Sequence, residues 1–250
     1  MSRRENTTYL YVREGPRPQA VPLRSEWPHL PPPVEPARPA SRQPPVRLVR
    51  PVTSAAAIDA RFALLFMPDS EAAAAYRAIA EQLQALRPGG GRVAFTALDR
   101  SVARTRTALN VAAALTESAG FAILVDLDPG SGALAATLGV QSFPGLRAQA
   151  EARERDARRP LDLLHVARRV GALPLEADGR LPTPTALAST LATLDSVATW
   201  TFLDAAPQAA VGLADAVVVV VSPAQAQSGR AALEEALPGL PIIGVVVAVG

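Results

Sequence analysis

The chain has 250 residues, 49% of them hydrophobic, and a formal net charge of +2, which suits one α/β domain with a sizeable core. It contains no cysteine and only two histidines, which excludes disulfides, thiolate metal sites and histidine-rich metal sites. All 25 basic residues are arginine, so a mechanism that needs a lysine cannot run in this chain alone.

The first 57 residues are rich in proline and arginine, and we interpret them as a disordered arm. Residues 1–53 hold 12 of the 24 prolines and nine arginines against four glutamates, a local balance of +5. Proline at this density blocks both helix and sheet. The arm is either a solvated linker or a docking segment, in which LPPPVEPARP (30–39) would lie in an aromatic groove. Its arginines are scattered among few aromatic residues, so no nucleic-acid partner is expected.

The sequence has no segment that predicts export or a membrane span. Its first residues lack the apolar core of a secretory signal, and no run approaches the length of a membrane-spanning helix. We therefore expect a soluble chain in the cytoplasm.

From residue 58 to 250, strand-like apolar runs alternate with helix-like segments, which predicts one α/β domain. The strand-like runs are 61–66, 92–97, 121–128, 161–167, 170–176, 199–207, 215–223 and 241–250. The helix-like segments are 69–86, 105–118, 133–140, 182–194 and 225–237. Asp69 and Ser70 are the expected caps of the first helix, and RPGGG (87–91) ends it.

This alternation favours βαβ units in a doubly wound, mostly parallel sheet with helices on both faces. In such sheets the functional site lies at the carboxyl ends of the strands. The segments at those ends are Thr96–Arg106, Asp126–Gly132 and Asp204–Pro207. We expect them to meet in one crevice.

Acidic residues end two of the apolar runs. Asp126 and Asp128 close AILVDLD, and Asp204 closes TFLD. Carboxylates grouped in this way suit Mg²⁺, with phosphate oxygens completing the coordination. The alternative is that each acid caps the next helix or faces solvent. Two such endings in one series of alternating strands and helices favour a functional or vestigial metal site.

The turn after the strand at 92–97 occupies the place of a phosphate-binding loop. A working loop, G-x-x-x-x-G-K-[ST], wraps phosphates with backbone N–H groups and neutralises them with its lysine. Within Asp99–Arg106, Arg104 stands where that lysine would be, and Thr105 where the Mg²⁺-binding hydroxyl would be. No glycine is present in this stretch, and Asp99 places negative charge where phosphate would lie. We expect no ATP turnover, and residual nucleotide binding stays open.

Five segments carry a family resemblance. They are EAAAAYRAIAEQLQAL (71–86), RVAFTALDRSVARTRTALNVAAAL (92–115), AILVDLDPGSGALAATLGV (122–140), TFLDAAPQAAVGLADAVVVVVSPAQA (201–226) and IIGVVVAVG (242–250). In this order they resemble the helix before the first core strand, the Walker A, A′ and B regions and a later strand of the MinD/ParA-type P-loop ATPases. The resemblance is closest to the bacterial tyrosine kinases that partner polysaccharide co-polymerases.

The resemblance implies roles for individual residues. Arg104 and Thr105 would be vestigial nucleotide-binding residues, and ATP and Mg²⁺ would be the cofactors if binding survives. Asp126, Asp128 and Asp204 would be vestigial metal ligands. Arg77 is what remains of an E-x-x-R-x-x-R oligomerisation motif, whose other two positions are alanine here. The tyrosine-rich tail of the kinases has no counterpart, because no tyrosine follows Tyr76.

We therefore expect a non-catalytic accessory or regulatory subunit of exopolysaccharide or capsule synthesis and export. It would be held at the inner membrane by a co-polymerase of the chain-length-determinant type, and assembly into a homo-oligomer stays open. One alternative is an active ATP-binding tyrosine autokinase or ATPase of the same pathway. Another is a MinD-like localisation or pilus-assembly factor.

Overall fold

A computed structural model describes residues 45–49, 62–99, 103–118, 120–130, 133–140, 143–226, 235, 237–239 and 242–247. Its strands are β1 (Val46–Val49), β2 (Gly91–Ala97), β3 (Ala122–Asp126), β4 (Leu161–Ala167), β5 (Val170–Leu173), β6 (Trp200–Asp204), β7 (Ala216–Val221) and β8 (Ile242–Val247). Its helices are α1 (Ala63–Phe66), α2 (Glu71–Leu86), α3 (Arg104–Ser118), α4 (Ala133–Thr137), α5 (Leu146–Arg155), α6 (Pro184–Asp195), α7 (Pro207–Ala210) and α8 (Pro223–Ala226).

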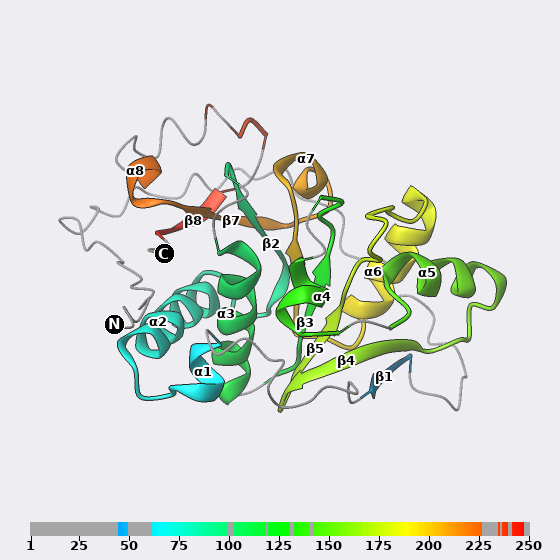
Figure 1. Ribbon diagram of the computed structural model, residues 1–250, viewed down its shortest axis with the longest axis horizontal. Helices are drawn as coiled ribbons and strands as arrows, with labels where there is room; N and C mark the ends of the chain where they lie inside the picture. Colours follow the sequence, from blue (N-terminus) through cyan, green and yellow to red (C-terminus); the bar gives the residue numbers. More distant parts are fainter. Residues whose placement is uncertain are drawn as a thin grey trace, which may run out of the picture.

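The strands form one sheet in the order β1-β4-β5-β3-β6-β2-β7-β8 (Figure 1). The pairs from β5 through β3, β6, β2 and β7 to β8 are all parallel. β4 pairs antiparallel with β5, and β1 pairs parallel with β4. The predicted mostly parallel α/β sheet is therefore confirmed.

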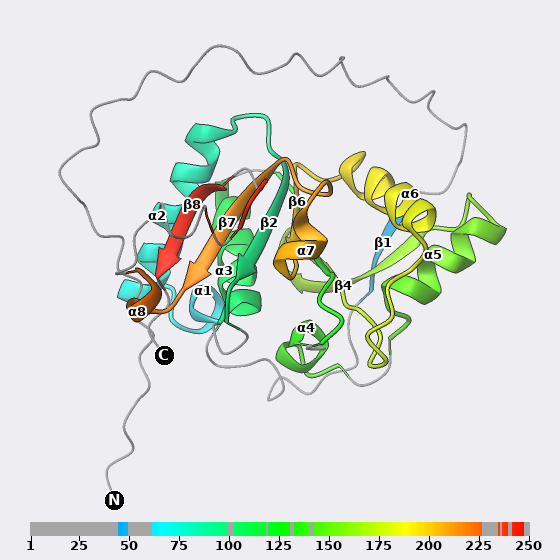
Figure 2. The same cartoon turned by 90° about the horizontal axis from the view of Figure 1, so that it is seen from above.

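Helices cover both faces of the sheet, which is why strands such as β3, β6 and β7 are buried along their whole length. One hydrophobic core joins α1, α2 and α3 to the sheet, and Phe95 and Phe202 meet edge to face in it, with centroids 5.2 Å apart. A second core lies on the other face, beneath α5, α6 and α7. Figure 2 shows α5 and α6 lying together, well apart from α2.

The long helix α2 begins and ends as its sequence predicts. The Ser70 side chain accepts a hydrogen bond from the backbone N–H of Ala73, so Ser70, and not Asp69, is the N-cap. The helix is followed by a glycine turn in which Gly90 has a φ of +79°, and a Cβ there would lie 1.9 Å from the Thr199 carbonyl oxygen. Glycine is required at this position by both conformation and space.

The interpretation of 61–66 as a strand is wrong for its described part. Ala63–Phe66 is the short helix α1, with Phe62, Ala63 and Leu64 buried against the core. The Leu64 N–H donates to Oδ1 of Asn110 on α3, at 3.2 Å, and not to a neighbouring strand. A short apolar run fits a buried strand or a buried helical turn equally well, and packing decides between them.

The range 1–57, interpreted as a disordered arm, includes one strand of the sheet. Val46–Val49 forms β1, and its residues Val-Arg-Leu-Val contain no proline, so their backbone can pair with β4. Because prolines are frequent in the surrounding sequence, the sequence pattern did not predict this short strand. Apart from Pro45, the other residues of the predicted arm lie outside the described residues, as does most of the predicted helix 225–237. None of the described helices is long and apolar enough to cross a membrane.

Replacing the cap of α2 tests this account of the helix start. We expect Ser70→Ala to lower the free energy of unfolding by about 1 kcal/mol, because the Ala73 N–H loses its acceptor. Asp69→Ala is the matched control and should change it by about 0.5 kcal/mol or less. Urea denaturation followed by circular dichroism measures both, and equal losses for the two variants would contradict the assignment.

Candidate functional site

Two acidic residues lie side by side at the carboxyl ends of neighbouring strands. Asp126 ends β3 and Asp204 ends β6, and the two are direct partners in the parallel register. Leu124 and Phe202, two positions earlier in each strand, belong to the core beneath α3. Because side chains alternate along a strand, both carboxylates point toward the α3 face. Both residues are fully buried.

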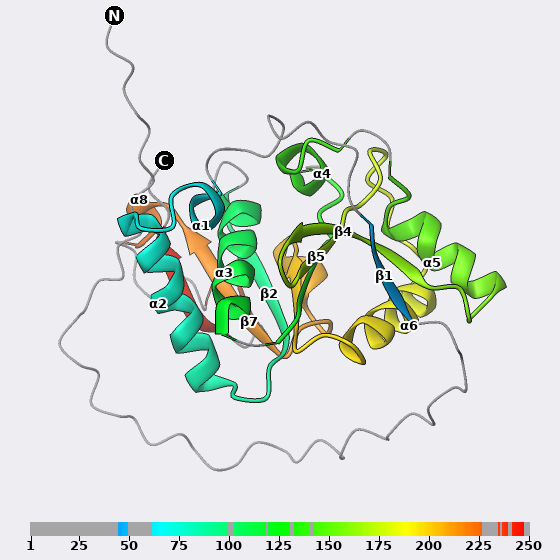
Figure 3. The same cartoon turned by 90° about the horizontal axis from the view of Figure 1, so that it is seen from below.

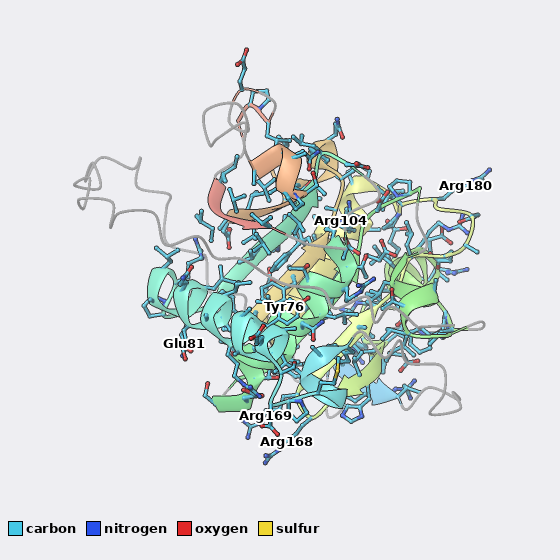
Figure 4. All side chains as sticks on the ribbon, turned by 60° about the vertical axis from the view of Figure 1, so that its left-hand side comes forward. Tyr76, Glu81, Arg104, Arg168, Arg169 and Arg180 are labelled. Carbon is cyan, nitrogen blue, oxygen red and sulfur yellow. The ribbon has the colours of Figure 1, made fainter. Side chains whose placement is uncertain are left out.

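Arg104, the first residue of α3, connects the acidic residues. Its Nη2 donates to Oδ2 of Asp128 at 2.7 Å, and its Nε donates to Oδ1 of Asp204. Burial alone would lower the pKa of Arg104, but the charges of Asp204 and Asp128 and the hydrogen bonds to them raise it above its ordinary value. The guanidinium is thus a buried, permanent cation held between two carboxylates. Figure 4 shows Arg104 at the start of α3.

Thr105 completes the hydrogen bonding of Asp204. Its hydroxyl donates to Oδ2 of Asp204, so both oxygens of that carboxylate are bound by residues at the start of α3. The positive end of the α3 dipole adds to this attraction. Residues 100–102 of the loop before α3 lie outside the described residues.

Asp126 is the acidic residue without a matched partner. Its Oδ1 accepts from the Asp128 N–H at 3.0 Å, whereas its Oδ2 is buried with no hydrogen-bond partner. Burial raises the pKa of Asp126 from 3.8 to about 7, and the negative charge of Asp204 acts in the same direction. The N–H groups of Asp128 and Leu134 and the charge of Arg104 oppose this rise only in part.

The structure therefore brings together all five residues predicted for the nucleotide and metal site. Their arrangement does not fit a Mg²⁺ ion, because Arg104 and Thr105 already bind oxygens of Asp128 and Asp204. Within the described part of the chain, no three carboxylate or histidine side chains are grouped to hold a metal ion. The positive charge that a cation would supply comes from the chain itself.

Arg77, the predicted interaction residue, lies away from this site and is engaged within the chain. It makes a double hydrogen bond to Glu117 on α3, at 2.7 and 2.8 Å, and donates to the Pro68 carbonyl at 2.7 Å. Arg77 thus fastens α2 to α3. Sequence reasoning missed Glu117, because two opposite charges 40 positions apart form no local pattern.

Comparison with known proteins identifies the fold. No protein-family model and no curated protein matches the sequence. Among solved structures, the chimerical protein CapA2B2 is similar with a TM-score of 0.59 at 15% identity, over 80% of this chain and 94% of that one. The VpsO kinase domain gives 0.53 at 19% identity, over 70% and 93%. The kinase domain of the Escherichia coli tyrosine kinase ETK gives 0.54 at 17% identity, over 74% and 78%.

At these identities the likeness establishes the fold and not the activity. The chain has the fold of bacterial tyrosine-kinase domains, the group to which the sequence resemblance is closest.

Removing the buried cation should destabilise the protein strongly. We expect Arg104→Ala to lower the free energy of unfolding by about 3–5 kcal/mol, because it leaves Asp128 and Asp204 buried without their partner. The control is Arg168→Ala, an exposed arginine well away from Arg104 in Figure 4, with an expected change of about 0.5 kcal/mol or less. Similar losses for the two variants in urea denaturation would refute the structural role of the ion pair.

Asp126 should make stability depend on pH. Its folded pKa of about 7 lies above its ordinary value of 3.8, so the folded chain binds this proton more tightly than the unfolded chain. The stabilisation is fully present below about pH 4 and is lost as pH rises to about 7, by at most about 4 kcal/mol.

We therefore expect wild type to lose stability between about pH 4 and about pH 7, and Asp126→Asn to lose clearly less. Denaturation curves at several pH values measure this difference, with Asp69→Asn as the surface control. Parallel pH profiles for wild type and Asp126→Asn would show that Asp126 does not titrate in this range.

Proposed function

We propose that this chain is a non-catalytic relative of the bacterial tyrosine kinases that acts in exopolysaccharide or capsule synthesis and export. In this role it is an accessory or regulatory subunit that binds the cytoplasmic end of a membrane co-polymerase. The fold of tyrosine-kinase domains supports the pathway. The observation that carries the non-catalytic role is the position of Arg104, whose guanidinium binds Asp128 and Asp204.

Phosphoryl transfer depends on positioning and on positive charge beside the transferred group. In this chain Arg104, at the start of α3, is occupied by two of the acidic residues. No lysine exists anywhere in the sequence to replace it, and no glycine lies between Phe95 and Arg106 to form a phosphate cradle. These features support loss of catalysis with retention of the scaffold.

A second candidate function is an ATP-binding autokinase or ATPase of the same pathway. It is supported by Thr105 and by the three acidic residues, which keep hydroxyl and carboxylate groups together at the start of α3. This function requires Arg104 to leave both carboxylates and turn toward phosphate. The two candidates therefore differ in whether nucleotide stabilises the folded chain.

A melting experiment with the full chain separates them. We expect millimolar Mg-ATP to leave the melting temperature unchanged, whereas ligand at 100 times its Kd would add about 2.7 kcal/mol of stability. The matched measurement uses Mg²⁺ alone and ATP alone, to account for effects of ionic strength. An upward shift that needs both Mg²⁺ and ATP would favour the autokinase or ATPase.

Affinity capture from membranes tests the proposed partner. Affinity-tagged full chain should recover the co-polymerase from detergent-solubilised membranes, with and without added ATP, because the scaffold role needs no nucleotide. Heat-denatured chain is the control for nonspecific capture. Recovery of no polysaccharide-export protein by folded chain would rule out this proposal even if ATP fails to bind.

A further inference from the structure

The turn between β5 and α6 lies against the acidic loop of the candidate site. It closes at Gly179, whose N–H donates to the Glu176 carbonyl at 2.9 Å. Gly179 has a φ of +64°, and a Cβ at this position would lie 2.1 Å from the Pro129 carbonyl oxygen. Glycine is therefore required here by conformation and by space. Figure 3 shows the connection between β5 and α6 passing between α4 and α5.

Pro129 follows the residue that binds Arg104 through its side chain. Asp128 Oδ2 accepts from Arg104 Nη2 at 2.7 Å, and Asp128 Oδ1 accepts from the Gly130 N–H at 3.0 Å. The direction of the Asp128 carboxylate is thus set by the backbone of a short loop, and Gly179 packs against that loop at Pro129. A displaced Pro129 would carry Asp128 with it, because the two residues are adjacent in the chain.

The other side of the turn holds the start of α5. That helix begins after Gly145, which provides no side-chain cap. Glu176 takes this role, because its two carboxylate oxygens accept from the N–H groups of Arg147 at 3.0 Å and Ala148 at 2.7 Å. The Arg147 side chain in turn pairs with Asp178 at 2.9 Å. The turn is therefore fastened to α5 by two side chains, and it contacts the site through its backbone.

We propose that the Glu176–Gly179 turn is a positioning element that holds Asp128 on Arg104 and so couples α5 to the state of the candidate site. While the turn stays in place, Arg104 remains bound and is not available to an anion. When the turn is displaced, Asp128 loses its direction and releases one arm of the guanidinium. The inference deepens the proposed function and rests on it, since the occupied Arg104 carries the non-catalytic role.

A glycine elsewhere in the chain provides a matched control. Gly212 has a φ of +73°, and a Cβ there would meet no atom within 4 Å. Gly179→Ala and Gly212→Ala therefore impose a similar backbone cost, and only the first adds a close contact with Pro129. Asp128→Asn, which weakens the pair with Arg104 directly, is the positive reference.

Arginine labelling of the full chain measures the effect. Phenylglyoxal modifies guanidinium groups that become accessible, and peptide mass spectrometry gives the rate at each arginine. We expect Arg104 to be labelled about tenfold faster in Gly179→Ala, as for the loss of one charge-assisted hydrogen bond, and at the wild-type rate in Gly212→Ala. The exposed Arg168 is the internal reference, and its rate should not change. Equal Arg104 rates in the two glycine variants would overturn the proposal.

Glu176→Gln tests the same turn without a change at Gly179. Glutamine keeps one acceptor oxygen, so one N–H at the start of α5 loses its partner and the turn is held less firmly. We expect Arg104 to be labelled about threefold faster in this variant. A rise at Arg104 that is matched at the half-buried Arg92 would show general loosening of the fold and would also overturn the proposal.

The labelling result is separable from the proposed function. A failure here would leave that function untouched, because the labelling is measured without nucleotide. Stabilisation by Mg-ATP would overturn the non-catalytic role and leave the labelling result standing.

Discussion

A buried guanidinium between two buried carboxylates is the interaction on which the centre of this structure depends. The parallel register of β3 and β6 sets Asp126 opposite Asp204, so the fold gathers negative charge at one edge of the sheet before any ligand is considered. Unpaired charges at this depth would oppose folding. Arg104 binds Asp204 and Asp128 together, and its position at the start of α3 thereby joins the helix to the ends of both strands.

The balance of charge is completed in two further ways. Asp126, which has no cationic partner, has a pKa near 7 and is partly neutralised by a proton. The start of α3 contributes the Thr105 hydroxyl and the positive end of the helix dipole. A planar guanidinium can bind two separate carboxylates through different N–H groups, which an ammonium cannot match in the same geometry. Arginine at this position therefore does more than retain a positive charge, because it closes the cluster without a bound cation.

The sequence predicted the frame of this site better than its internal contacts. Apolar runs ending in Asp126 and Asp204 indicate strand ends, and the rules for parallel sheets bring such ends together. The direction of the Arg104 side chain was not predictable, because its partners lie 24 and 100 positions away. The same limit explains α1 and β1. Each is only four residues long, and tertiary contacts with Asn110 and Asp162, not local pattern, fix its conformation.

Polar groups at the centre of the sheet and at its rim are satisfied differently. At the centre, Arg104, Asp128 and Asp204 are buried, and their hydrogen bonds are made to one another within the chain. At the rim, β1 is held by backbone hydrogen bonds to β4 and by an ion pair with Asp162, whose partner Arg47 has a side chain that is 58% exposed. The strand order places β4 and β5 between β1 and β3. The centre and the rim of the sheet are therefore held by independent interactions, because the two sets of contacts share no residue.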